Sequence, residues 1–211
     1  MFEAFAITLV GVVAAQASPG PNLIAVASAA LGQGRVSALL VTLGISTGML
    51  FWAVAVSFGL GALFVQYPMS LTLLKLIGGS YLIWLAVRAL MSVARGGDVV
   101  ISANNHPHSR LRSWLHGIAV VLTNPKAALM WSAVATYLFG ANLTTAQVAL
   151  FGPVGAVSGL LIYGSYAFLF STGSATVLYQ RFSQGVETLF AASFGLFGGK
   201  LLIDGVRELR S

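Results

Sequence analysis

Long apolar stretches separated by short polar or basic segments dominate the sequence. No Lys, Arg, Asp or Glu occurs between Arg35 and Lys75, and Lys126 is the only one between Trp114 and Gln180. A helix needs about 20 apolar residues to cross a bilayer, so each stretch is long enough for two crossings. The pattern predicts an all-α membrane protein with six transmembrane helices. The predicted spans are 2–27, 37–64, 70–91, 114–139, 145–171 and 185–206.

The first predicted span is interrupted by a pair of prolines. Pro19 and Pro21 flank Gly20 inside an otherwise apolar run. Each proline removes a backbone donor, and glycine tolerates backbone angles that other residues avoid. One proline would only kink a helix, whereas this arrangement predicts a short non-helical segment. The helix that restarts near Asn22 should present unpaired N–H groups and a positive dipole end, which attract carboxylates.

The fourth predicted span is interrupted in a related way. Pro125 frees the carbonyl of Val121 and biases Asn124 away from helical angles. Lys126 follows directly, about halfway along the span, where an ammonium costs about 2.5–3.5 kcal/mol on insertion scales. We therefore expect Lys126 to face the protein interior and to meet a substrate or a counter-charge. The alternative is a simple proline kink with a lysine that reaches toward the membrane surface.

Paired helix breaks near the bilayer midplane indicate a transporter site. Broken backbone at that depth is tolerated only where protein buries it or where it lines a wet cavity. We expect the two breaks to face each other across such a cavity and to bind an amino acid. Its ammonium would take the freed carbonyls of Ala15, Ala17 or Val121. The predicted substrate-binding residues are Ser18, Pro19, Gly20, Pro21, Asn22, Thr123, Asn124, Pro125 and Lys126.

The chain also shows weak internal repetition. The glycine pair of the second span recurs in the fifth, residues 79–88 resemble 198–207, and the first and fourth spans each contain a proline break. These matches predict two inverted three-helix repeats, 1–91 and 113–211, joined by a polar cytoplasmic loop at 92–112. Small residues four apart let helices pack closely, and such faces also permit a homodimer. The glycines assigned to helix packing are Gly44, Gly48, Gly155 and Gly159.

Charge supports the membrane assignment and sets an orientation. Only 8% of the residues are charged and 57% are hydrophobic, whereas a soluble domain carries about 25% charged residues. Basic residues follow the first, third and fifth spans and are absent after the second and fourth. This predicts that the loops after the first, third and fifth spans are cytoplasmic and that both termini lie outside. Arg207 and Arg210 oppose this orientation. The net charge of +6 is explained by these loops rather than by nucleic-acid binding.

Several classes of function lack the necessary residues. The chain has no cysteine, and no nucleophile triad, zinc-protease motif or phosphate-binding glycine loop occurs, so we expect neither an enzyme nor a cofactor. His106 and His108 form a pair in the polar loop but are weak evidence for a metal site. Two alternatives to an amino-acid transporter remain open, namely export of another small solute or metal ion on the same fold, and a non-transporting membrane subunit.

Three segments resemble the lysine-exporter (LysE/RhtB) family of amino-acid exporters. They are Ser18-Pro19-Gly20-Pro21-Asn22, Tyr81-Leu82-Ile83-Trp84-Leu85 and Leu122-Thr123-Asn124-Pro125-Lys126-Ala127. The resemblance covers nearly the whole chain. It implies a bacterial inner-membrane secondary exporter with six spans in two inverted repeats, moving amino acids such as lysine, threonine, homoserine or leucine outward with the proton gradient.

This sequence departs from that family at two membrane positions. Many members carry an acidic residue or a histidine where this chain has Met49, and several carry an acid in the fifth span, where it has Val157 and Ser158. Such acids would suit a proton carrier or an ammonium partner. Their absence leaves the coupling ion open and argues against a strongly cationic substrate.

Overall fold

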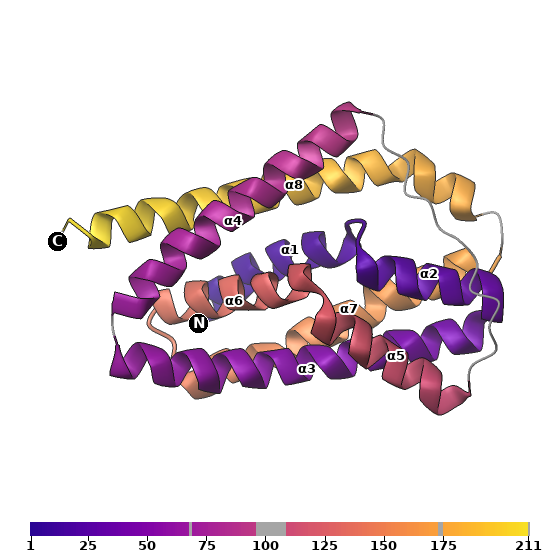
Figure 1. Ribbon diagram of the computed structural model, residues 1–211, viewed down its shortest axis with the longest axis horizontal. Helices are drawn as coiled ribbons and strands as arrows, with labels where there is room; N and C mark the ends of the chain where they lie inside the picture. The colour runs from indigo at the N-terminus through magenta and orange to yellow at the C-terminus, as the bar shows by residue number, and fades with distance from the viewer. Residues whose placement is uncertain (68, 96–108, 173–174, 211) are drawn as a thin grey trace.

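The computed structural model describes residues 1–67, 69–95, 109–172 and 175–210, which form eight α-helices and no strand (Figure 1). The helices are α1 (Phe2–Ala17), α2 (Pro21–Gln33), α3 (Arg35–Gln66), α4 (Met69–Ala94), α5 (Arg110–Thr123), α6 (Pro125–Gly140), α7 (Thr145–Phe170) and α8 (Ala175–Glu208). The protein is therefore all-α across its described residues, as the apolar pattern predicts.

Four of these helices are each long and apolar enough to cross a membrane, namely α3, α4, α7 and the Thr188–Glu208 part of α8. The pair α1 and α2 bends by 48° at its break, and the pair α5 and α6 bends by 62°. If each bent pair is one span, the described part of the chain has six. The residues between 96 and 108, with His106 and His108, lie outside the described residues.

Helix ends extend beyond the predicted spans. Helix α2 continues to Gln33 and stops before Gly34, whose positive φ of 82° favours glycine. The predicted polar loop is helical at both of its edges, because α4 runs to Ala94 and α5 begins at Arg110. Apolar run length therefore predicts that a helix exists better than it predicts where the helix ends.

Helix α4 packs along α8, and α3 packs between α7 and α5 (Figure 1). Glycines make the closest approaches. A Cβ atom added at Gly79 would lie 2.9 Å from the carbonyl oxygen of Gly198, and one added at Gly198 would lie 2.8 Å from that of Gly79. Helices α4 and α8 therefore cross with their backbones in contact, as small residues allow.

The glycines assigned to helix packing all face neighbouring helices of the same chain. A Cβ added at Gly44 would lie 2.0 Å from the Trp114 carbonyl oxygen, and one added at Gly48 would lie 2.2 Å from the Val121 side chain. At Gly155 it would lie 3.0 Å from Trp131, and at Gly159 2.9 Å from Met49. These faces are covered within one chain, so they no longer give a reason to expect a homodimer.

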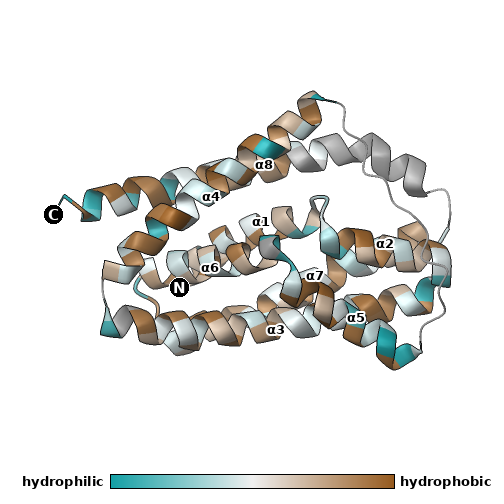
Figure 2. Cartoon of the chain, viewed as in Figure 1, coloured by the Kyte–Doolittle hydropathy of each residue, from teal (hydrophilic) through white to brown (hydrophobic). Residues whose placement is uncertain are grey.

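The surface matches a membrane environment. Large apolar side chains are exposed on every long helix, among them Phe51, Leu161 and Leu196. Hydrophobic residues follow the helices along most of their length, and hydrophilic positions gather near helix ends and at the breaks (Figure 2). The C-terminal ends of α2, α4 and α7 point toward one end of the molecule, and both termini lie toward the other end (Figure 1).

Candidate functional site

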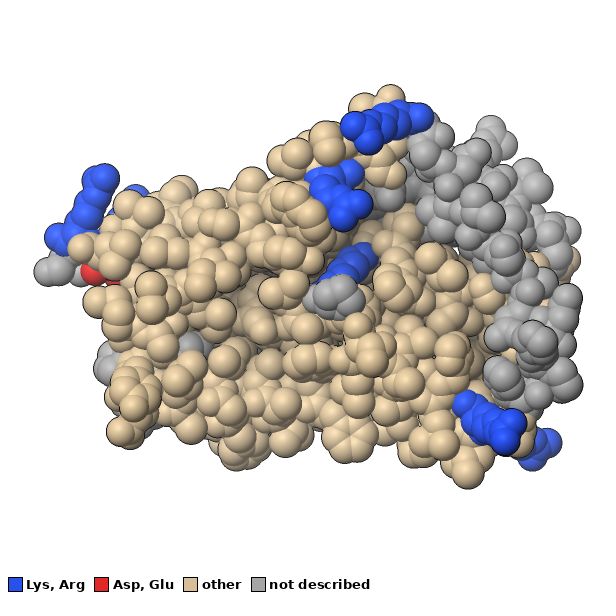
Figure 3. Space-filling model, in the orientation of Figure 1, with Lys and Arg blue, Asp and Glu red and all other residues tan. Residues whose placement is uncertain are grey.

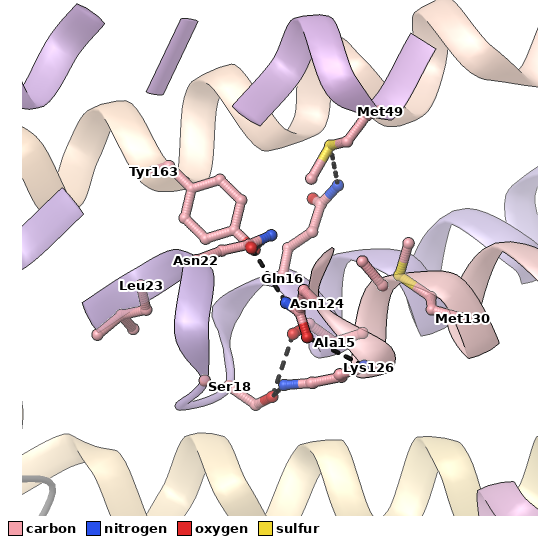
Figure 4. A pocket seen from close by; sticks show the side chains of 12 residues that line it. Ala15, Gln16, Ser18, Asn22, Leu23, Met49, Asn124, Lys126, Met130 and Tyr163 are labelled. Carbon is pink, nitrogen blue, oxygen red and sulfur yellow. Dashed lines mark hydrogen bonds between the residues drawn. The ribbon is translucent and has the colours of Figure 1, made fainter. Parts of the chain in front are cut away.

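The two helix breaks meet inside the molecule (Figure 4). Pro21 and Pro125 each occupy the first turn of the helix that restarts, where a missing N–H costs nothing. The Asn124 side-chain Nδ2 donates to the Oδ1 of Asn22 at 3.0 Å, and both asparagines are 5% exposed. A buried hydrogen bond therefore joins two segments that lie 102 residues apart in sequence.

The restarted helices differ in how their first turns are capped. The Oδ1 of Asn124 accepts from the Lys126 backbone N–H at 3.0 Å and so caps α6. Helix α2 begins after Gly20, and no side chain caps its first turn. The N–H groups at a helix start carry partial positive charge, so two such starts side by side favour a negatively charged ligand group.

Lys126 points toward the first break. Its ammonium donates to the Ser18 hydroxyl and to the Pro19 carbonyl oxygen, the latter at 3.3 Å. It also lies 4.4 Å from the centre of the Phe190 ring, within range of a cation–π contact. The side chain is thus held between the breaks, with its positive charge next to the start of α2.

The carbonyls freed by the breaks already have protein donors. Ala15 O accepts from the Ser18 hydroxyl at 3.1 Å, and Ala17 O accepts from the Tyr166 hydroxyl at 2.8 Å. Val121 O accepts from the Trp52 indole N–H at 3.1 Å. A substrate ammonium at any of these carbonyls would have to share it, which weakens the ammonium role expected for them.

Gly20 does not have the backbone angle that the sequence suggests. Its φ of 171° and ψ of 178° are extended angles that any residue adopts. An added Cβ would lie 3.5 Å from the Lys126 Nζ, at ordinary contact distance. Neither the backbone angles nor the space beside the lysine therefore requires glycine at this position.

A cavity of about 20 Å³ lies where the breaks meet. This space holds one or two water molecules and is too small for a whole amino acid. Its wall is polar on the side of the breaks and apolar on the other. The lining residues are Ala15, Gln16, Ser18, Gly20, Asn22, Leu23, Met49, Asn124, Lys126, Ala127, Met130 and Tyr163 (Figure 4).

Comparison with known proteins places this arrangement in a family. The family model described as "LysE type translocator" matches residues 13–205. The chain belongs to the LysE family. Members of this family are translocators, not enzymes.

Two proteins named for efflux are similar in sequence to this LysE-family chain. The threonine efflux protein of Escherichia coli (strain K12) is 30% identical over 189 residues, covering 89% of this chain and 91% of the relative. The homoserine/homoserine lactone efflux protein of Salmonella typhimurium is 26% identical over 185 residues, covering 87% of this chain and 88% of the relative. No solved structure matches the chain.

Thr123 does not reach the cavity of this LysE-family protein. Its side chain is exposed, and its hydroxyl donates to the Ala119 carbonyl of its own helix at 2.7 Å. The prediction that Thr123 lines the site followed from its position beside Asn124 and Pro125. Thr123 is the last residue of α5, and its hydroxyl bonds back to that helix instead of reaching the start of α6.

Two polar residues of the cavity wall, Gln16 and Tyr163, were not among the predicted ones. Gln16 donates to the Gly155 carbonyl at 2.9 Å and accepts from the Ser158 hydroxyl at 3.0 Å, and the Asn22 Nδ2 donates to the Tyr163 hydroxyl at 3.3 Å. Gln16 carries the only amide side chain of α1, two residues before Ser18. An isolated polar residue in an apolar helix could have been predicted to line the cavity, whereas nothing in the sequence around Tyr163 indicates that it faces the cavity.

The residues of this cavity do not resemble a metal-binding site. Among the residues that the structure describes, no group of three or more His, Cys, Asp and Glu could hold a metal ion. The cavity wall offers amide, hydroxyl, ammonium and thioether groups instead. These groups suit a small polar organic molecule better than a divalent cation.

Proposed function

We propose that this LysE-family protein is a secondary exporter of a zwitterionic amino acid with an uncharged side chain, such as threonine or homoserine, across the bacterial inner membrane. The observation that carries the proposal is the convergence of the Lys126 ammonium and the uncapped start of α2 on one buried cavity. That pairing suits a carboxylate in a setting where water is scarce. The named functions of the two relatives support an amino acid as the cargo.

The substrate would bind by displacing contacts within the site. Its carboxylate would take the Lys126 ammonium and the N–H groups at the start of α2. Its own ammonium would then replace Lys126 at the Ser18 hydroxyl and the Pro19 carbonyl, which accept from the lysine now. The side chain would extend toward Met49 and Met130 on the apolar wall. That wall offers nothing to a second positive charge, which disfavours lysine as cargo.

Export requires the cavity to open, because about 20 Å³ cannot hold an amino acid. We infer that the two halves of the chain are inverted repeats that rock around the paired breaks. The reciprocal crossing of α4 and α8 supports this inference. A Cβ at Gly79 would approach the N of Leu202, four residues after Gly198, while a Cβ at Gly198 would approach the N of Ile83, four residues after Gly79.

The proposed orientation follows the basic residues. Arg35 and Arg110 begin α3 and α5, and Arg95 directly follows α4, at helix ends that point toward the same end of the molecule (Figure 1). Basic loops remain in the cytoplasm, so we place this end inside and both termini outside. Proton coupling is part of the proposal, and no Asp, Glu or His is among the described residues that line the cavity. The residue that carries the proton would therefore lie outside the cavity or be Lys126 itself.

The test is uptake into inverted membrane vesicles energised with a proton gradient. Labelled threonine, homoserine, leucine and lysine are compared in vesicles with and without the protein. We expect uptake of the neutral amino acids that an uncoupler abolishes. Preferential uptake of lysine would contradict the proposed substrate class. Failure to move any amino acid would favour the other-solute or non-transporting alternatives.

A further inference from the structure

A second cavity of about 250 Å³ adjoins the site, and we call it the vestibule. It shares Ser18 and Lys126 with the small cavity, so their hydrogen bond lies at the boundary between the two spaces. Unlike the small cavity, the vestibule has room for an amino acid. The residues lining it are Ser18, Pro19, Leu85, Arg88, Ala89, Ser92, Lys126 and Phe190.

The vestibule has a positive charge at each end. Lys126 lies at the breaks, and Arg88 lies on α4 less than two turns before the helix ends at Ala94. That end of α4 belongs to the end of the molecule that we assign to the cytoplasm. On the side of the molecule that Figure 3 shows, a Lys or Arg side chain lies in a hollow and others lie nearer the edge. A substrate entering from the cytoplasm would therefore meet Arg88 first and Lys126 second.

Arg88 is held in a way that leaves its donors available. Its guanidinium carbon lies 5.0 Å from the centre of the Trp84 ring, on the same helix. Stacking on an aromatic face orients the guanidinium plane and does not use its N–H groups. The ion pairs that the structure gives in its described part, Lys75–Glu208 and Lys200–Asp204, do not involve Arg88. The guanidinium N–H groups of Arg88 can therefore donate to a planar anion.

We propose that Arg88 is a specificity-determining residue that binds the substrate carboxylate in the vestibule before Lys126 receives it. This inference rests on the proposed function, because it concerns how that substrate is selected. Arginine fits a carboxylate with two parallel hydrogen bonds, whereas an amide presents one oxygen and no charge. The vestibule therefore selects molecules with a free carboxylate over their amides. A basic residue serving only as a membrane-orientation signal would make no such distinction.

The test is competition against labelled threonine in inverted vesicles, with unlabelled threonine and threonine amide as competitors. Arg88→Gln should raise the KM for threonine about threefold to tenfold, as expected for a charged pair open to solvent, while the maximal rate changes less than twofold. Its inhibition by threonine amide should stay as in the wild type. Arg88→Lys should give an intermediate KM. Arg95→Gln is the matched control, because it removes a charge from the same end of α4 outside the vestibule and should leave all values unchanged.

Three results would overturn the inference. The first is an unchanged KM for threonine in Arg88→Gln, and the second is an equal weakening of threonine and its amide. The third is the same effect from Arg95→Gln, which would point to overall charge rather than to the vestibule. A wild-type protein that moves no amino acid would instead overturn the proposed function and this inference with it.

Discussion

Replacing Asn124 by alanine would remove two contacts at the junction of the breaks. The side chain caps α6 by accepting from the Lys126 N–H, and it donates to Asn22 across the junction. Asparagine to aspartate at the same position keeps both contacts and adds a negative charge. The aspartate oxygen still caps the helix, and the Asn22 amide can turn so that its nitrogen donates to the aspartate and its oxygen accepts from Tyr163.

The size of the effect follows from those contacts. Loss of an N-cap costs about 1 kcal/mol. The Asn22 oxygen, in a residue that is 5% exposed, would lose its donor, which costs about 1–3 kcal/mol. Asn124→Ala should therefore lose about 2–4 kcal/mol, which lowers the unfolding midpoint by about 5–15 °C for a chain of this length. Asn124→Asp should keep most of the stability, because the cap survives and its charge lies near Lys126.

Thermal unfolding in detergent and threonine transport in vesicles are measured together. Asn124→Asp should fold yet raise the KM for threonine about tenfold or more, because its carboxylate competes for the positive site. Thr144→Ala is the matched control, since Thr144 caps α7 away from the cavity. It should cost about 1 kcal/mol and leave the KM unchanged. An unchanged midpoint in Asn124→Ala, or wild-type transport in Asn124→Asp, would refute the reasoning.

Two further predictions concern helix packing and are read from unfolding midpoints. Gly44→Ala should cost about 1–3 kcal/mol or more, because its methyl would lie 2.0 Å from the Trp114 carbonyl oxygen, whereas Gly59→Ala on the same helix meets nothing within 4 Å and should be neutral or slightly stabilising. Equal midpoints for these variants would contradict the close approach of α3 and α5. Glu208→Gln should destabilise more than Lys75→Met, because it leaves the ammonium of Lys75, which is 5% exposed, without its charged partner. The reverse order would contradict the expected cost of leaving the Lys75 ammonium buried without its charged partner.

Much of the architecture could be predicted because it depends on local chain chemistry. Proline has no N–H, which predicts the breaks at Pro19, Pro21 and Pro125 from the sequence, although Pro153 lies inside α7 without ending that helix. The length of the apolar runs predicts six spans, and the described part of the structure has four candidates, or six if each bent pair is one span. Lys126 could be identified because a charge in the middle of a span is costly. Lys75 is also charged and lies near the start of a predicted span, and its pairing with Glu208 was missed because the partner lies 133 residues away.

The rest of the site depends on how each helix is rotated. Apolar residues surround nearly the whole of α7, so no periodicity marks the side of Tyr163 and Tyr166 that faces the breaks. Thr123 was placed wrongly for a related reason, since being next to a break in sequence does not fix where a side chain points. The partners of the freed carbonyls, such as Tyr166 for Ala17 at a separation of 149 residues, require the packed structure.

The central claim is that an amino acid crosses the membrane through the cavity where the two breaks meet. Its most direct test is threonine efflux from proteoliposomes containing wild-type protein, Lys126→Met or Lys200→Met. The last is the control, because its lysine is 56% exposed on α8 and does not line that cavity. We expect Lys126→Met to fold and to retain less than about a tenth of the wild-type rate, since a charge-assisted hydrogen bond contributes about 1.5–3 kcal/mol. Lys200→Met should transport normally. Wild-type rate and KM in Lys126→Met would contradict the claim.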